Sequence, residues 1–414
     1  MIRIDVLPDD VLLEIFDLYM MIMNRSYRGK AAVEAWQSLV HVCRRWRTLV
    51  FESPRRLNLR LLCTSKISVR NRLDVWPALP LIIRGFMDLS RGSSTDNVIA
   101  ALGQSNRVRE VFLSDLTDRQ WEEALAPMQV SFPELTDLKL WSWAYGETLI
   151  PDSFLGGSAP RLRFLCLDSI SFPGLPKLLM SATHLVDLHL YRIPHSGYFS
   201  PKAIAAVLSA SFSLEKLFLG FLSPQSCPYR ETRSLPPQKR SVLPSLHGFR
   251  FRGVTEYLEE LVTRIDTPQL DYMEITFFNQ IDFDCPRLAQ FINCTPIFGA
   301  LDEARVQFWD SFASVMLPSR TSEFEGDKLC ILISCREPDW QLSSIEQVCN
   351  NSLPPLPAVE DLYIERRYSG LVWKDEAIEN TLWLQLLLPF TTVKHLYLAK
   401  KICAGCCDRH ARAW

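Results

Sequence analysis

Residue types that bind metal ions cluster near the end of the sequence. Cys403, Cys406 and Cys407 are followed by His410, and thiolates and imidazoles are the ligands that structural Zn²⁺ prefers. A structural zinc site usually joins two separated ligand pairs, so that binding closes a loop. Here all four candidates lie within eight residues. We therefore expect residues 401–414 to be an atypical, disordered tail, and we predict neither a metal site nor a cofactor.

Other patterns that carry chemistry are missing from the sequence. It contains no Gly-rich phosphate loop, no nucleophile elbow and no paired zinc-ligand motif. The seven histidines are dispersed, and His184, His189 and His395 lie in or beside strand-like segments. A structural or surface histidine is commoner in such places than a catalytic one without a positioned partner. The sequence predicts no catalytic residue and a protein that is not an enzyme.

Composition and charge narrow the class of protein. The chain has 414 residues, of which 48% are hydrophobic and 22% charged, as in globular proteins. A formal net charge of -2 gives no electrostatic reason to expect nucleic acid as the main ligand. One local basic run contains Arg44, Arg45, Arg47, Arg55, Arg56 and Arg60. We interpret this run as a solvated helix face and turn, because no aromatic stacking platform accompanies it.

Nothing in the sequence predicts secretion or a membrane span. Asp5 comes early, without a continuous apolar segment before it. Residues 382–390 are interrupted by Gln385 and Pro389 and fall short of the ~20 apolar residues that a bilayer requires. The twelve cysteines lack disulfide-framework spacing, which favours reduced, buried thiols. We expect a soluble protein of the cytoplasm, the nucleus or both.

The first fifty residues carry more apolar surface than they can bury. A helix is predicted to start at Pro8, with Asp9 and Asp10 in its first turn, where negative charge is favoured. Its apolar residues form two stripes, one with Leu12, Phe16 and Tyr19 and the other with Val11, Ile15, Leu18 and Ile22. A second helix has the same excess, with Trp36, Leu39, Val40, Cys43, Trp46 and Val50 at three- and four-residue steps. One face of each helix can form a core, and the other needs a cover.

These segments resemble a known family. "LPDDVLLEIFDLY" from Leu7 and "WQSLVHVCRRWRTLV" from Trp36 look like an F-box, the helical module that docks on the Skp adaptor of SCF-type ubiquitin ligases. The continuation "ESPRRLNLRLLCTSKISVRNRLDVWPALPLIIRG" is similar to the F-box proteins of mushroom-forming, basidiomycete fungi. The linker Asn24–Ala35 is longer than in a minimal F-box. The resemblance implies contacts with the Skp adaptor, and through it with cullin, by Leu7, Pro8, Ile15, Leu39, Val42, Cys43 and Trp46.

A Leu-x-x-Leu-x-Leu pattern recurs along the rest of the chain. Its nine matches begin at Val108, Leu135, Leu162, Leu185, Leu214, Leu246, Leu270, Val359 and Val393. Through Leu270 the first positions are 23 to 32 residues apart, close to the spacing of leucine-rich repeats. Between Ile275 and Val359 the only plausible carriers are Leu301-Ala304-Val306 and residues 329–333. In each match the last two apolar residues should point into the core, while Lys139, His189 and Tyr363 point outward.

Helix-like stretches at 118–128, 201–210 and 254–265 separate the predicted strands. Each repeat is therefore a strand, a turn and a helix, and such repeats stack because one alone cannot bury its apolar face. The predicted fold class is α/β, with an N-terminal helical F-box followed by an irregular leucine-rich-repeat solenoid whose parallel β-sheet lines the concave face. Residues 223–245 are rich in Pro, Ser and Arg and predict an exposed loop.

The sequence predicts four regions. They are a helical docking module (1–56), a linker with the first solenoid elements (57–104), the degenerate repeat solenoid (105–400) and the tail (401–414). The function that this organisation and the resemblance imply is a substrate-recognition subunit of an SCF-type ubiquitin ligase, which presents an unidentified protein target without nucleic acid or membrane. The alternative is a repeat-scaffold interaction module in which the N-terminal helices only cap the solenoid; periodicity alone favours such a cap.

Overall fold

A computed structural model shows a mixed α/β chain with two compact units, Met1–Cys166 and Leu167–Trp414. It describes residues 6–26, 33–64, 69–86, 95–142, 148–226, 240–280, 282–298, 301–318, 327–353, 356, 358–367 and 376–399. The predicted tail, with Cys403, Cys406, Cys407 and His410, lies outside the described residues. So do residues 227–239, which make up most of the predicted loop 223–245.

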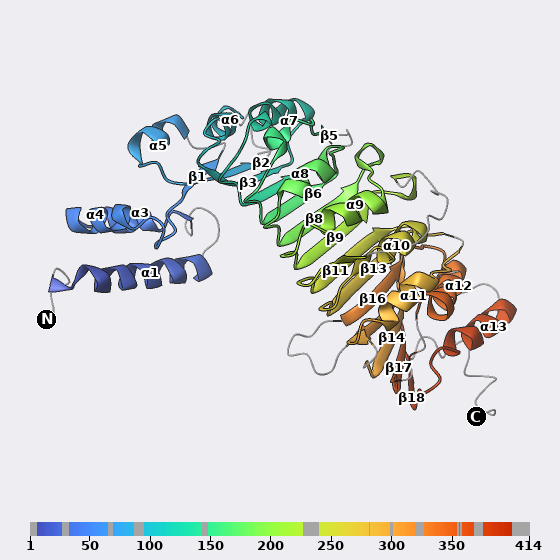
Figure 1. The fold of residues 1–414 in the computed structure, drawn as a ribbon. Helices are drawn as coiled ribbons and strands as arrows, with labels where there is room; N and C mark the ends of the chain where they lie inside the picture. The colour runs from blue at the N-terminus through green and yellow to red at the C-terminus, as the bar shows by residue number, and fades with distance from the viewer. Residues whose placement is uncertain are drawn as a thin grey trace. The chain divides into compact units, whose positions relative to one another are not determined.

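The first unit begins with helices and continues into a parallel sheet (Figure 1). Its helices are α1 (Asp9–Ser26), α3 (Trp36–Val40), α4 (Arg44–Glu52), α5 (Val69–Val75), α6 (Asp96–Leu102) and α7 (Asp118–Leu125), with short 3-10 turns η2 (Ala126–Gln129) and η3 (Phe154–Gly157). Its strands are β1 (Leu61–Thr64), β2 (Leu81–Phe86), β3 (Val108–Ser114), β4 (Asp137–Trp141), β5 (Thr148–Leu149) and β6 (Phe164–Asp168). Strands β1 to β4 pair in parallel in chain order, and β6 follows β4.

The second unit repeats a strand and a helix along a larger sheet. Its helices are α8 (Leu175–Ser181), α9 (Pro201–Leu208), α10 (Thr255–Val262), α11 (Pro286–Asn293), α12 (Pro338–Gln347) and α13 (Glu376–Leu387), with short turns η4 (His195–Gly197), η5 (Pro224–Ser226) and η7 (Val348–Ser352). Its strands are β7 (Ile170–Ser171), β8 (Asp187–Ile193), β9 (Lys216–Phe221), β10 (Ser241–Val242), β11 (Gly248–Gly253), β12 (Ile265–Asp266), β13 (Tyr272–Phe277), β14 (Glu303–Phe308), β15 (Ala313–Pro318), β16 (Asp327–Ile333), β17 (Asp361–Arg366) and β18 (His395–Leu398). The sheet has the order β8-β9-β11-β13-β16-β15-β14-β17-β18.

The nine leucine patterns all fall on strands, which confirms the predicted period of two. The strands that contain them are, in chain order, β3, β4, β6, β8, β9, β11, β13, β17 and β18. In β4, Leu138 and Leu140 are fully buried while Lys139 between them is exposed. Parallel pairing aligns equivalent residues of neighbouring strands, as with Leu188 and Leu217. Only in β18 are the pattern's last two residues exposed.

The sheet is mostly parallel, as predicted, and departs from parallel pairing at one place. Both carriers proposed for the degenerate stretch do form strands, β14 and β16, but β15 lies antiparallel between them. Phe308 of β14 pairs with Ala313 of β15, so only four residues connect the two strands. A parallel crossover needs a connection of a dozen or more residues. This hairpin also reverses the strand order, because β16 rather than β14 pairs with β13.

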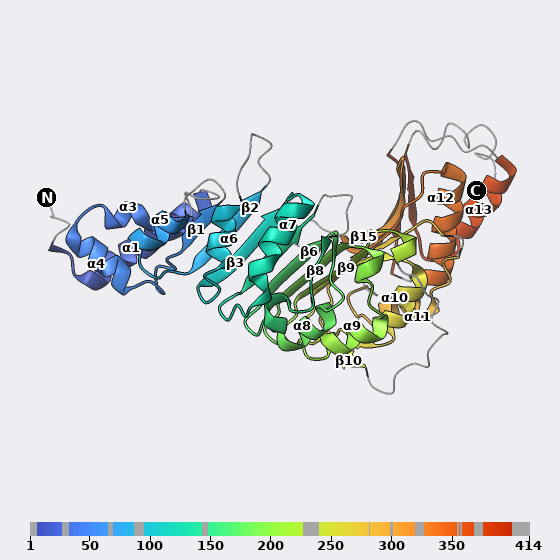
Figure 2. The ribbon, with the colours of Figure 1, turned by 90° about the horizontal axis from the view of Figure 1, so that it is seen from above.

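The three predicted helical stretches form α7 with η2, α9 and α10. Thr117 caps α7 in a capping box with Gln120, and Ser200 caps α9 just before Pro201. Helices α8 to α11 contact one another in chain order along one face of the second unit's strands (Figure 2). Tyr257 of α10 packs on Phe221, with ring centroids 4.7 Å apart. The apolar strand residues therefore face the helices. No helix in the described part of the chain is long and apolar enough to cross a membrane.

Candidate docking surface

Helix α1 is the scaffold of the surface that the sequence singled out. It begins at Asp9, one residue later than predicted, and the amide of Leu12 donates to the carbonyl of Pro8 over 3.0 Å. Pro8 thus supplies only a carbonyl oxygen to the helix, a role that needs no N–H. Asp9 and Asp10 occupy the first turn, where the helix dipole favours negative charge. These residues fix where the helix starts.

One face of α1 forms the core of the helical module. Leu12, Phe16 and Met20 are buried, at four-residue spacing. The Phe16 ring lies against Trp46 of α4, with centroids 4.7 Å apart. Tyr19, which the sequence placed in this stripe, is only half-buried. The predicted inward face is therefore present, with Met20 as its third fully packed residue.

The opposite face of α1 stays uncovered in the described chain. Val11, Ile15, Leu18 and Ile22 follow each other at helical spacing, and between 39% and 56% of each residue's surface is exposed. Met21 on the same helix is also exposed. Isolated exposed apolar residues are ordinary, but a contiguous row marks an interaction surface. We call this row the α1 stripe.

The predicted second helix is two helices, which corrects the continuous helix expected from the sequence. Helix α3 ends at Val40, and Cys43 has extended backbone angles as the N-cap of α4. The Trp46 amide donates to the Cys43 sulfur over 3.5 Å. Val42, in the turn between the helices, is 57% exposed. Because the helix breaks here, Val42 and Cys43 lie in an exposed turn instead of on the face of a continuous helix.

Charged contacts hold the start of α1 against the start of α4. Arg45 donates from Nε to the Asp9 carboxylate over 2.9 Å and from Nη2 to the Leu7 carbonyl over 2.6 Å. These bonds tie Leu7 and Asp9 to Arg45 in the first turn of α4, two residues after the Val42–Cys43 turn. Arg56 likewise pairs with Glu14 on α1. Exposed pairs contribute about 0–1 kcal/mol each, so they position the surface more than they stabilise it.

The structure brings most of the predicted adaptor contacts together. Pro8, Ile15, Val42 and Cys43 are exposed, and Leu7 and Trp46 are half-buried. Leu39 is the exception, because only 6% of its surface is exposed. It packs beneath the turn as part of the module's core and has no surface to offer a partner. Spacing alone did not separate Leu39 from Val42, since the chain leaves the helix between them.

A second set of contacts anchors α3 to the sheet of the first unit. The Trp36 indole N–H donates to the Arg60 carbonyl over 2.9 Å, and its ring packs edge-on against Trp76 at 5.0 Å. Nearby, the buried Glu34 carboxylate pairs with Arg72 and accepts the amide of Leu62 over 3.0 Å. The module is therefore joined to β1 and α5 through α3 and the residues before it, while the α1 stripe takes no part in this junction.

Most arginines of the module's basic run are engaged by acids and carbonyl groups. Besides Arg45 and Arg56, Arg60 pairs with Glu110, and Arg47 donates to the Val40 carbonyl over 3.0 Å. The run is thus more tied to the protein than the solvated face expected from the sequence. Four of the six arginines of the run, Arg45, Arg47, Arg56 and Arg60, are thus engaged within the first unit.

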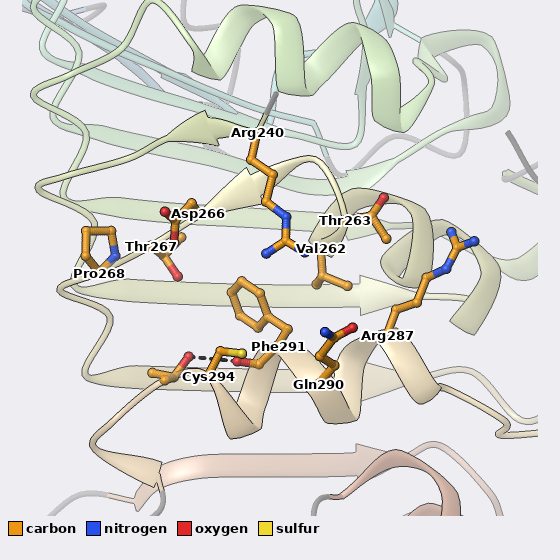
Figure 3. Close-up of a pocket in the computed structure, with 11 residues that line it drawn as sticks. Arg240, Val262, Thr263, Asp266, Thr267, Pro268, Arg287, Gln290, Phe291 and Cys294 are labelled. Atoms are coloured by element: carbon orange, nitrogen blue, oxygen red, sulfur yellow. Dashed lines mark hydrogen bonds between the residues drawn. The ribbon is translucent and has the colours of Figure 1, made fainter. Parts of the chain in front are cut away.

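The second unit holds a small pocket and two histidine contacts. The pocket in Figure 3 lies between α10 and α11 and has a volume of about 60 Å³. Asp266 is the only carboxylate among its described lining residues, beside Arg240 and Arg287, and no histidine lines it. His395 does lie 2.9 Å from Asp361 on neighbouring strands, and His189 lies 3.0 Å from the Tyr191 hydroxyl. Neither pair has a nucleophile placed beside it in the described contacts, and the described residues contain no cluster suited to a metal ion.

Comparison with known proteins adds no assignment to this geometry. Neither a protein-family model nor a curated protein sequence matches the chain.

Proposed function

We propose that the chain is a substrate-recognition subunit of an SCF-type ubiquitin ligase, which docks on the Skp adaptor through its N-terminal helices. The observation that carries the proposal is the α1 stripe, an apolar row that the described residues leave uncovered, in a module where Val42 is exposed as well. It occupies the segment whose sequence resembles an F-box. The second unit, which continues the repeat pattern as a degenerate leucine-rich-repeat solenoid, then presents the target.

Apolar burial, rather than charge, supplies the docking energy in this proposal. Covering a fully exposed large aliphatic side chain stabilises a complex by about 1.5–3 kcal/mol, and a half-exposed one by about half as much. Summed over the α1 stripe, this exceeds the about 0–1 kcal/mol expected for an exposed ion pair. The mechanism is positioning: docking raises the effective concentration of target lysines near the ubiquitin-charged enzyme. The chain itself carries out no bond chemistry.

The test is capture of a purified fungal Skp adaptor by the full chain and by a double variant. This variant, called the stripe variant, combines Ile15→Asp on the α1 stripe with Val42→Asp in the turn before α4. Both residues are exposed, so the substitutions should leave the unfolding midpoint unchanged while adaptor capture falls at least about a hundredfold, because two charges would be buried at the interface. Val75→Asp is the matched control: Val75 is 72% exposed on α5, away from the stripe. Equal capture by the stripe variant and the control would refute the docking assignment.

The alternative is a repeat scaffold whose N-terminal helices act only as a cap. The Trp36 and Glu34 contacts with Arg60, Trp76 and Arg72 favour it, since they show that the helices do pack on the first strand. A cap, however, gives no reason for an exposed apolar row on α1. If the wild-type chain captures neither the Skp adaptor nor cullin from a reconstituted mixture, the scaffold function replaces the ligase function.

A further inference from the structure

An arginine on the outward face of the second unit's sheet has no ion-pair partner among the described residues. Arg252 follows the buried Phe251 in β11, and its side chain is therefore on the face opposite the helices. Its Nε atom is buried without a hydrogen-bond partner among the described residues. Its guanidinium stacks over the Phe278 ring at 5.5 Å. Burial, together with the nearby Arg192, lowers the pKa of Arg252, so the protein around it does not compensate the charge.

Arg252 lines an open hollow of about 390 Å³. Strand register places Thr276 of β13 and Leu332 of β16 in the same row as Arg252. The remaining walls come from the end of β16 and from the turn between β14 and β15, with Ser311, Phe312, Ser334, Cys335 and Arg336. The described lining thus holds two guanidinium groups, three hydroxyl groups, two apolar side chains and the thiol of Cys335. It holds no carboxylate, although Ser311 donates to the neighbouring Asp310 over 3.3 Å.

Acidic residues on the same face are already matched to other cations. Glu274, one row away from Arg252, pairs with Arg250 at 3.2 Å and also accepts the Tyr272 hydroxyl. Asp168 pairs with Arg192 at 2.6 Å. At the hollow, by contrast, Arg252 and Arg336 have no acidic partner among the described residues.

We propose that the hollow binds one oxyanion, a carboxylate or a phosphate, carried by a peptide segment of the target. Guanidinium groups match the geometry of both oxyanions, and the aromatic stacking of Arg252 holds its fork in place. Thr276 and Ser334 can add hydroxyl donors, while Phe312 and Leu332 offer apolar walls to the rest of a side chain. The volume lies within the range of about 300–1,000 Å³ typical of ligand pockets. That the occupant is the ligase target rests on the proposed function. The existence of the oxyanion site does not depend on that function.

The test measures fluorescence anisotropy of three labelled peptide pools, random except for a central phosphoserine, glutamate or serine, with the full chain. We expect the phosphoserine or the glutamate pool to bind more tightly than the serine pool. Arg252→Gln should weaken that binding about tenfold or more, because a charge-assisted hydrogen bond is lost, and Arg336→Gln should weaken it less, since Arg336 is exposed. If the phosphoserine pool binds more tightly than the glutamate pool, the site prefers phosphate. If these two pools bind equally and both bind more tightly than the serine pool, a carboxylate is sufficient.

The matched control is Arg287→Gln in the pocket of Figure 3, which removes the same charge from the helical side. It should change binding less than twofold. Equal binding of all three pools, or an Arg252→Gln variant that folds and binds like wild type, overturns the proposal. Arg252→Gln should still capture the Skp adaptor. If the wild type binds the anionic pools through Arg252 but captures no adaptor, the ligase function fails and the oxyanion site stands.

Discussion

Helix α1 and the strands of the second unit both alternate inward and outward residues, yet they differ in what faces outward. On α1 the outward row is aliphatic and uncovered, as at Ile15 and Leu18. On the sheet, outward positions carry Lys216, Arg250 and Glu274, and the last two pair with each other. Solvent satisfies a polar row, whereas an apolar row gains free energy only when a partner covers it. The contrast separates a surface built for a partner from one that is stable in water.

The largest expected effect tests this contrast within α1 itself. Phe16→Ala should lower the free energy of unfolding by about 3–5 kcal/mol, because Phe16 is fully buried against Trp46. Ile15→Ala, one residue away on the α1 stripe, should change it by no more than about 0.5 kcal/mol. Urea unfolding of both variants measures the difference. Similar losses would mean that the stripe is covered within the chain and is not free for a partner.

The same comparison can be made on adjacent strands of the first unit. Leu165→Ala should cost about 2–5 kcal/mol, since Leu165 is fully buried in β6. Lys139→Ala on the outward side of β4 should cost about 0.5–1 kcal/mol, because the ammonium group lies 4.3 Å from the Phe164 ring centroid. Thermal and urea unfolding give both values. Equal losses would contradict the assigned strand faces.

Strand positions could be predicted because the leucine pattern reports burial on one side of each strand. Period-two alternation fixes which residues face the core, and eight of the nine matches are buried as expected. Pairing direction is a different matter. Nothing in the apolar residues of segment 313–318 marks its direction, and the four-residue connection after Phe308 makes it antiparallel. Apolar period carries no information on strand direction or order.

The docking surface was predictable to a similar extent and for a similar reason. Helical spacing separated the buried row with Leu12 and Phe16 from the stripe with Ile15. It could not show that the next helix breaks at Cys43 and leaves Leu39 buried. The Arg45–Asp9 contact joins residues 36 positions apart, and such long-range pairs follow from tertiary packing rather than from local spacing. The oxyanion hollow escaped prediction entirely, since its lining comes from four separate segments of the chain.

The smallest expected effect is a change in the reactivity of single thiols. Cys43 and Cys294 are both exposed, but only Cys43 belongs to the docking surface. Saturating Skp adaptor should slow alkylation of Cys43 by iodoacetamide about tenfold, because a docked partner covers the turn before α4. Alkylation of Cys294 should continue at its original rate. Mass spectrometry of the digested chain at successive times gives both rates from one sample.

Cys63 supplies the internal reference for this experiment. It is buried in β1, and burial raises the pKa of its thiol from 9.0 to about 11. At pH 8 it should stay unlabelled with or without adaptor, since the thiolate is the reactive form. Folding favours the protonated thiol, so the stability linked to Cys63 is present below pH 9 and is lost as the pH rises through about 11. Labelling of Cys63 at pH 8 would therefore report unfolding. If Cys63 stays unlabelled and saturating adaptor leaves the alkylation rate of Cys43 unchanged, the adaptor does not cover the turn before α4. The outward apolar row would then lose its interpretation as a docking surface.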